Sequence, residues 1–214
     1  MIIAVETADL VNSTQLTHED FMIVSNAIDN ELTDNKDRYT LVFERFRGDA
    51  HQVTYFQAEY AVRISLLVRL ATYIALPAHH TLLTQSLLVG SQAKEDKMGA
   101  VYIASGRHLD KLKRSGFLVD FISDTYTMAL PSQFMQALLN GLTSKQAQAL
   151  YWYIKLGFPD QQTIAKHLNM TRQNVNTHLQ RANSDLVKAF IDTYEANVTQ
   201  LKQEQVVPSS GDKR

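Results

Sequence analysis

The chain has 214 residues, of which 45% are hydrophobic and 20% are charged, a composition that allows a packed core and excludes global disorder. It contains no cysteine, which excludes disulfides, thiolate metal sites and cysteine nucleophiles. The N-terminus lacks the basic segment of a signal peptide, and no apolar run reaches the ~18 residues that a membrane span needs. We therefore expect a cytoplasmic protein without a membrane partner.

The net charge of −1 is unevenly distributed along the chain. Residues 143–188 include six basic and two acidic side chains, which is a net charge of +4 and leaves −5 for the rest. A basic segment in a nearly neutral protein is typical of a nucleic-acid-binding part joined to a part with another task. Chance clustering is the alternative, and charge alone does not decide between the two.

The first ~130 residues alternate apolar runs of strand length with stretches of helical periodicity. The predicted strands lie at 2–5, 39–46, 53–56 and 82–89, with one or two more within 117–130. The predicted helices lie at 17–32, 58–75 and 106–113. The order strand, helix, strand, strand, helix, strand predicts an α+β, ferredoxin-like domain in which helices cover one face of a sheet.

From Pro131 onward the pattern is helical. We therefore expect a sensing or dimerisation domain at 1–135 and an all-α domain at 136–200. Residues 201–214 end in Pro-Ser-Ser-Gly-Asp-Lys-Arg, which is typical of a disordered tail.

The segment 160–182 reads DQQTIAKHLNMTRQNVNTHLQRA and predicts two helices joined by a sharp turn. Its apolar positions are Ile164, Ala165 and Leu168 in the first helix and Val175 and Leu179 in the second. Asn169 stands at the turn, where Asn tolerates the left-handed conformation. Thr171 is placed to cap the second helix.

The outward face of this second helix carries side chains that suit DNA. They are Thr171, Arg172, Gln173, Asn174, Asn176, Thr177, Gln180 and Arg181, and none is acidic. Arg pairs with guanine, and Asn or Gln pairs with adenine, through the major groove. The pattern therefore predicts binding to double-stranded DNA. The alternative is a helical hairpin used for dimerisation or protein binding.

The segment also resembles the helix-turn-helix of LuxR-type regulators and of sigma factor region four. The matching residues are Ile164-Ala165, Leu168-Asn169-Met170-Thr171, Val175 and His178, and the upstream helix from Ser144 fits as a scaffold. The resemblance implies a transcriptional regulator that reads DNA through the second helix.

Two acidic residues stand out in the first domain. Asp9 follows the first strand, and Asp49 lies in the hairpin after the second. In the predicted order these turns can meet at one sheet end, where two carboxylates could hold a divalent cation with phosphate oxygens completing its shell. The alternative is that each acid simply favours its own turn.

Three short blocks resemble the SatD family, small bacterial proteins that pair such a domain with a C-terminal helix-turn-helix. The blocks are Asp9-Leu10-Val11-Asn12-Ser13, Phe46-Arg47-Gly48-Asp49 and Ser105-Gly106-Arg107-His108-Leu109-Asp110. The first block follows Ala8, where the family pattern usually has Gly.

The same domain is similar, more distantly, to class III nucleotidyl cyclases. That resemblance implies Mg²⁺ with a nucleotide: Asp9 and Asp49 would hold the metal, and Asn12, Ser13, Gly48 and Arg107 would contribute to the ligand site. Ile103 stands where those enzymes need an Asn, and losing such a donor costs about 3 kcal/mol of transition-state stabilisation. We therefore expect a binding or sensing module rather than an active enzyme.

Together these patterns predict a dimeric DNA-binding transcriptional regulator whose first domain senses a ligand or dimerises. Two other functions remain open. One is a nucleotide-processing enzyme with a DNA-binding appendage, and the other is a protein-interaction module.

Overall fold

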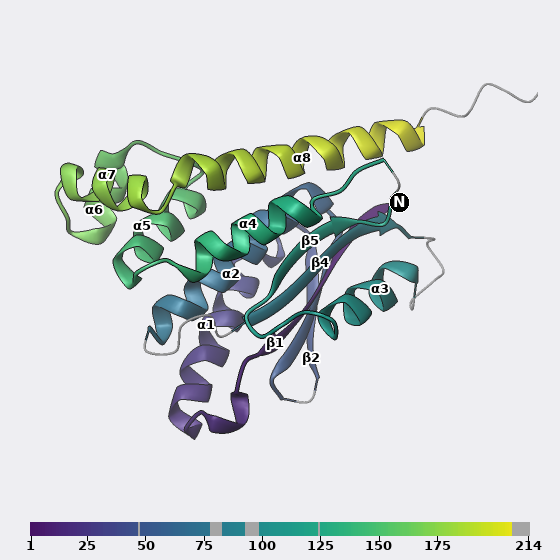
Figure 1. The fold of residues 1–214 in the computed structure, drawn as a ribbon, viewed down its shortest axis with the longest axis horizontal. Coiled ribbons are helices and arrows are strands. Elements are labelled where there is room, and N and C mark those ends of the chain that lie inside the picture. The colour runs from purple at the N-terminus through teal and green to yellow at the C-terminus, as the bar shows by residue number, and fades with distance from the viewer. Residues whose placement is uncertain (47, 78–82, 93–98, 124, 207–214) are drawn as a thin grey trace, which may run out of the picture.

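A computed structural model describes residues 1–46, 48–77, 83–92, 99–123 and 125–206 (Figure 1). Its strands are β1 (Ile2–Leu10), β2 (Leu41–Phe46), β3 (Ala50–Tyr55), β4 (Leu83–Ser91) and β5 (Phe117–Phe121). Its α-helices are α1 (His18–Lys36), α2 (Ala61–Ala75), α3 (Ala100–Leu109), α4 (Ala129–Asn140), α5 (Ser144–Lys155), α6 (Gln161–Leu168), α7 (Arg172–Arg181) and α8 (Ser184–Val206). Short 3₁₀ turns follow β1 at Ser13–Gln15 and precede α2 at Ala58–Tyr60.

The strands form one sheet in the order β2-β3-β1-β4-β5. β1 pairs antiparallel with β3 and with β4, whereas β5 is parallel to β4. The first four strands, with α1 and α2, follow the predicted ferredoxin-like order. β5 joins through α3, because a parallel pair needs a crossover connection. The prediction of a mixed helix and sheet architecture is therefore confirmed.

The first strand is longer than predicted. β1 continues to Leu10, so the prediction of a loop at Asp9 is wrong. β1 is the central strand and is hydrogen-bonded on both sides, so Thr7 and Asp9 stay in extended pairing although they are polar.

Helices cover both faces of the sheet, which corrects the expectation of one covered face. Ile3 and Val5 pack with Leu88 against Val101 of α3, while Ile2 and alternate residues of β1 face α1 and α2. Figure 1 shows α3 on the opposite side of the sheet from α2 and α4. Successive residues of a strand point to opposite faces, so the unbroken apolar run at the start of β1 makes both faces of the sheet apolar there. Both faces must then be covered by helices.

Two predicted elements differ from the structure. The helix expected at 106–113 is α3, which ends at Leu109 and turns Val101 and Ser105 inward. The strand content expected within 117–130 ends at Phe121, and α4 begins at Ala129. The Asp120 carboxylate accepts a hydrogen bond from the Met128 N–H at 2.9 Å, which closes the connection before α4.

The C-terminal helices share a core with the sheet. α8 runs back over α4 and β5 (Figure 1), and its buried Tyr194 donates a hydrogen bond to the Ala58 carbonyl at 2.8 Å. Phe190 packs on Phe117 with ring centroids 6.3 Å apart. The domain boundary predicted at 135/136 therefore lies inside α4, between two parts of one continuous core.

The end of α8 corrects the predicted tail. The helix continues through Val206, so the disorder expected from residue 201 is wrong for 201–206, while 207–214 lie outside the described residues. Lys202 forms an ion pair with Glu59, and Tyr126 donates to Glu204 at 2.6 Å. These contacts hold the last turns of α8 against the 3₁₀ turn before α2 and against the connection between β5 and α4. Across the described ranges, no helix has both the length and the apolar character to cross a bilayer.

Candidate nucleic-acid interface and acidic pocket

The turn between α6 and α7 has the predicted local chemistry. Asn169 adopts the left-handed conformation with φ 50°, and the Thr171 side chain accepts a hydrogen bond from the Asn174 N–H at 3.2 Å. Asp160 caps α6 by accepting from the Thr163 N–H at 2.8 Å. The predictions of a left-handed turn and of the Thr171 cap are confirmed.

A small separate core fixes the orientation of α7. Its buried members are Ala149, Ile164, Ala165, Val175 and Leu179, contributed by α5, α6 and α7. Trp152 of α5 stacks on His167 of α6, with ring centroids 4.6 Å apart and planes inclined by 19°. Because Val175 and Leu179 point into this core, the remaining sides of α7 face solvent.

We call the outward residues of this helix the α7 face: Arg172, Gln173, Asn174, Asn176, Thr177, Gln180 and Arg181. Five of them are exposed, and Asn176 and Thr177 are half-buried. The Thr177 hydroxyl donates to the Gln173 carbonyl at 3.0 Å, so it is left as an acceptor. α6 and α7 lie at one end of the molecule, away from the sheet (Figure 1). The α7 face therefore presents mostly exposed amide and guanidinium groups, while Asn176 and Gln180 lie beside the start of α8.

The positive charge of residues 143–188 is partly neutralised in the fold. Lys155 contacts Glu31 at 2.9 Å, and Lys188 contacts Asp192 at 2.5 Å. Lys145, Lys166, Arg172 and Arg181 form no ion pair with the part of the chain that the structure describes. The positive charges of the α7 face that form no ion pair are therefore Arg172 and Arg181, at the two ends of the helix.

The Asp160 carboxylate lies close enough to Arg172 for the positive charge of Arg172 to affect its pKa. The pKa of Asp160 is lowered, first by the hydrogen bond from the Thr163 backbone and, more weakly, by Arg172. Asp160 is committed to its cap, so it orients α6 rather than covering the α7 face.

Asp9 and Asp49 meet at one end of the sheet. Asp9 pairs in register with Ala50 of β3, and the Asp49 carbonyl accepts from the Leu10 N–H at 3.2 Å. The Ser13 hydroxyl donates to the Asp49 carboxylate. The hairpin and the turn after β1 are therefore joined by hydrogen bonds around the two acids.

These residues line a pocket of about 440 Å³, which we call the acidic pocket. Of the predicted ligand residues, it contains Asp9, Asn12, Ser13 and Asp49. Asn12 curls the chain into the pocket with a left-handed φ of 56°. The pocket lining does not include Gly48, whose φ of 83° serves the hairpin.

Arg107, predicted as a ligand residue, is not among the residues that line the acidic pocket. It is exposed on α3, and Asp110 and Arg114, just beyond that helix, line the pocket instead. The sequence signal for Arg114 is the basic run Lys111-Leu112-Lys113-Arg114. That run could not be assigned to the pocket without knowing that α3 ends at Leu109.

The charge state of Asp9 reflects the proximity of Asp49. Burial raises the pKa of Asp9 first, the negative charge of Asp49 raises it further, and the Leu10 N–H and His51 oppose the shift. Among the described residues, no group of three or more His, Cys, Asp or Glu is arranged to hold a metal ion. A cation here would rest on two carboxylates, the number with which Mg²⁺ is often held when phosphates and waters supply the other ligands.

Comparisons with known proteins identify no family. No family model matches the chain, and no curated protein matches it. The chain is similar to solved structures of nucleotidyl cyclases. The guanylyl cyclase Cya2 is 16% identical with a TM-score of 0.42, over 56% of this chain and 75% of that chain. The adenylyl cyclase CyaB from P. aeruginosa is 14% identical with a TM-score of 0.43, over 56% of this chain and 76% of that chain.

A third similar structure is described as the catalytic core of a rhodopsin-guanylyl cyclase in complex with ATPalphaS. It is 17% identical with a TM-score of 0.41, over 56% of this chain and 76% of that chain. At these identities and TM-scores the similarity assigns neither a site nor an activity. The resemblances to the SatD family and to known helix-turn-helix units stay predictions.

Proposed function

We propose that the protein is a DNA-binding transcriptional regulator that reads its operator with the α7 face. The observation that carries the proposal is a largely exposed helix face of Arg, Asn and Gln side chains mounted on a separate three-helix core. A helix of 10 residues is about 15 Å long, which suits the major groove. The N-terminal residues of such a helix reach base edges.

The residues of the α7 face have distinct roles in this proposal. Arg172, Gln173 and Asn174 lie in the first turn, where a bidentate contact to the correct base contributes about 1–3 kcal/mol of discrimination. Arg181, at the other end, is placed for a phosphate. A phosphate contact carries no sequence information but makes affinity fall with salt.

The test is enrichment of fragments from a genomic DNA pool at two salt concentrations. We expect the wild type to enrich specific fragments and Arg172→Ala/Asn174→Ala to lose that selectivity. The matched control is Arg38→Ala/Asn30→Ala, which removes the same two side-chain types from exposed positions, Asn30 on α1 and Arg38 just after its end. If the α7 variant and the control both enrich the wild-type fragments, the α7 face does not read DNA.

A second candidate function rests on the acidic pocket, and it is binding of Mg²⁺ with a nucleotide. The specific observation is that Asp9, whose pKa is raised, and Asp49 share a pocket with Asp110 and with the guanidinium-bearing Arg114. A cation would relieve the repulsion between the acids, and Arg114 could contact a phosphate. In a regulator, this ligand would serve as the effector.

Calorimetric titration with a nucleoside triphosphate, with and without Mg²⁺, tests the second candidate. We expect saturable, Mg²⁺-dependent binding that Asp49→Ala abolishes and that Asp37→Ala, at the exposed end of α1, leaves unchanged. Chromatography of the nucleotide distinguishes an effector from a substrate. Triphosphate consumption that Asp49→Ala removes would establish the enzyme instead of the sensor, and no binding at all would rule out both.

A further inference from the structure

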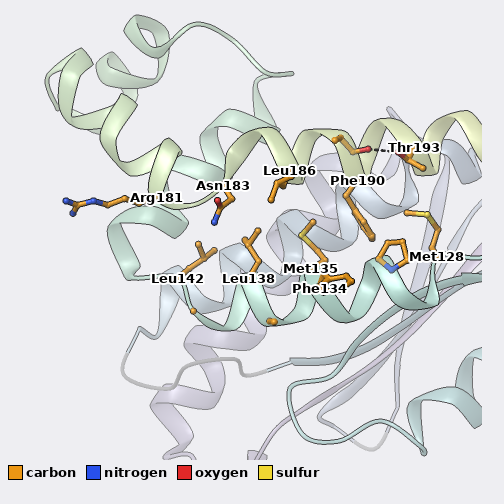
Figure 2. Close-up of a pocket in the computed structure, with 14 residues that line it drawn as sticks. Met128, Phe134, Met135, Leu138, Leu142, Arg181, Asn183, Leu186, Phe190 and Thr193 are labelled. Atoms are coloured by element: carbon orange, nitrogen blue, oxygen red, sulfur yellow. Dashed lines mark hydrogen bonds between the residues drawn. The ribbon is translucent and has the colours of Figure 1, made fainter.

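An apolar groove lies between α4 and α8, and Arg181 is the one residue that its lining shares with the two sites described above. The groove has a volume of about 760 Å³ (Figure 2). Its floor includes Met128, Met135 and Phe190, which are buried. Its lining also includes Phe134 on α4 and Leu186 on α8 (Figure 2), which we call its rims.

The rims are unusually exposed for large apolar side chains. Phe134 is 70% exposed, Leu186 is 61% exposed, and Leu130, one turn before Phe134, is 60% exposed. Among the described residues, these are the three most exposed large hydrophobic side chains. Scattered exposed apolar residues are normal, but a cluster around a concave apolar surface marks an interaction site.

The C-terminal residues 207–214 of this sequence do not supply a suitable occupant. They contain only Val207 and Pro208 as apolar side chains, so they lack the bulk to fill the groove. The occupant must bring its own large apolar ridge.

A second copy of the chain carries such a ridge on the same surface. Phe134 of α4 lines the groove and is exposed, and the exposed Leu130 lies one turn before it on the same helix. In a two-fold dimer the same patch serves both partners, so each ridge fills the other groove at the same time. Two helix pairs stacked in this way form a four-helix bundle, a stable arrangement of amphipathic helices.

Charge does not oppose this pairing. Of the groove residues, only Arg181 is charged, and it lies at the α7 end with its side chain directed away from the groove (Figure 2). Two identical faces can therefore approach at the centre of the groove without like-charge repulsion. We propose that the α4–α8 groove is the interface through which two copies of the protein dimerise.

The size of the groove sets the expected strength. Stable interfaces bury about 800 Å² and 20–30 residues on each side. The groove is lined by 14 residues, so we expect a dimer that dissociates on dilution. One end of the groove is lined by Arg181, the last residue of α7, and by Asn183. Dimerisation would therefore place two α7 faces in one assembly, as a paired DNA site requires.

Analytical ultracentrifugation of the full chain over a wide concentration range, without DNA, tests the proposal. We expect the wild type to pass from one to two chains as concentration rises. Phe134→Glu and Leu186→Glu should each weaken the dimer at least about 30-fold, as loss of an interface hot spot does. The matched control is Met22→Glu, which places a charge at an apolar position on α1 that is 43% exposed. Circular dichroism verifies that each variant is folded.

Cysteine crosslinking gives a second readout, because the chain has no cysteine of its own. Ala137 is exposed and lines the groove, so Ala137→Cys should form an oxidised dimer and Met22→Cys should not. A wild type that is monomeric throughout, or a dimer that both glutamate variants leave intact, overturns the proposal. So does a monomer whose groove binds dodecanoate, since the groove would then be a small-ligand site. Since no DNA is present, none of these outcomes depends on the α7 face.

Discussion

At the scale of single residues, the acidic pocket is the place where the fold tolerates an unfavourable charge. Burial and Asp49 both raise the pKa of Asp9, so the folded protein binds a proton at Asp9 more tightly than the unfolded chain does. Such a group destabilises the fold once it is ionised. The penalty is absent at pH values below the unfolded pKa and is complete above the folded pKa.

Asp9→Asn should therefore raise the melting temperature at neutral pH in a buffer that contains a chelator. The difference from wild type should shrink as the pH falls through the raised pKa of Asp9, because the wild-type carboxyl then becomes neutral. Added Mg²⁺ should stabilise the wild type and leave Asp9→Asn unaffected. Asp37→Asn, at the exposed position directly after α1, is the control. A melting temperature that Asp9→Asn lowers at neutral pH would show that Asp9 is a structural acceptor.

At the scale of elements, one buried cation connects helices to the sheet. Arg69 of α2 donates to the carbonyls of Leu83 and Ser115 at 2.9 and 2.8 Å, and to the Asn140 side chain at 3.0 Å. Burial lowers the pKa of Arg69 to about 10, and Glu6 opposes the shift, so the side chain is charged at neutral pH. Its removal would leave buried acceptors without their donor.

Arg69→Met should lower the free energy of unfolding by about 3–5 kcal/mol, the usual cost of breaking a buried charged network. Arg63→Met should cost only about 1 kcal/mol. Arg63 meets Glu195 at 2.7 Å, but both side chains are partly exposed and the pair is screened by solvent. Urea unfolding of both variants measures the difference, and equal losses would contradict this ranking.

At the scale of the whole molecule, the C-terminal helices contribute side chains to the large core of the sheet. α5 contributes Ala149 to the core beneath α7, and it contributes Leu150 and Ile154 to the core of the sheet. α8 adds Tyr194 and Val198 to that same large core. The α7 face is thus attached to the sheet through two helices rather than through a linker.

This connection predicts cooperative unfolding. Trp152, the only tryptophan, lies in the α5–α7 unit and reports on it by fluorescence. We expect its unfolding transition in urea to coincide with the loss of circular dichroism of the whole chain. Fluorescence that changes at lower urea would mean that the α5–α7 unit unfolds independently of the sheet.

The sequence was most informative where local chemistry decides the structure. Thr171 and Asn169 define the turn before α7 because capping and a left-handed φ are preferences of the residues themselves. The periodicity of Val175 and Leu179 likewise located the buried side of α7 and hence its outward face. The strand and helix order that leads to the sheet was also recognisable from periodicity.

Tertiary structure decided what depends on distant neighbours. β1 continues through Asp9 because it is hydrogen-bonded to a neighbouring strand on both edges. Because α3 ends at Leu109, Arg114 and not Arg107 lines the acidic pocket. Contacts with Glu59 and Tyr126 extended α8 beyond the predicted tail boundary. The α4–α8 groove also exists only because two helices separated by more than forty residues pack side by side. Residue preferences specify turns, caps and buried sides, whereas the pairing of remote surfaces is set by packing that no local pattern encodes.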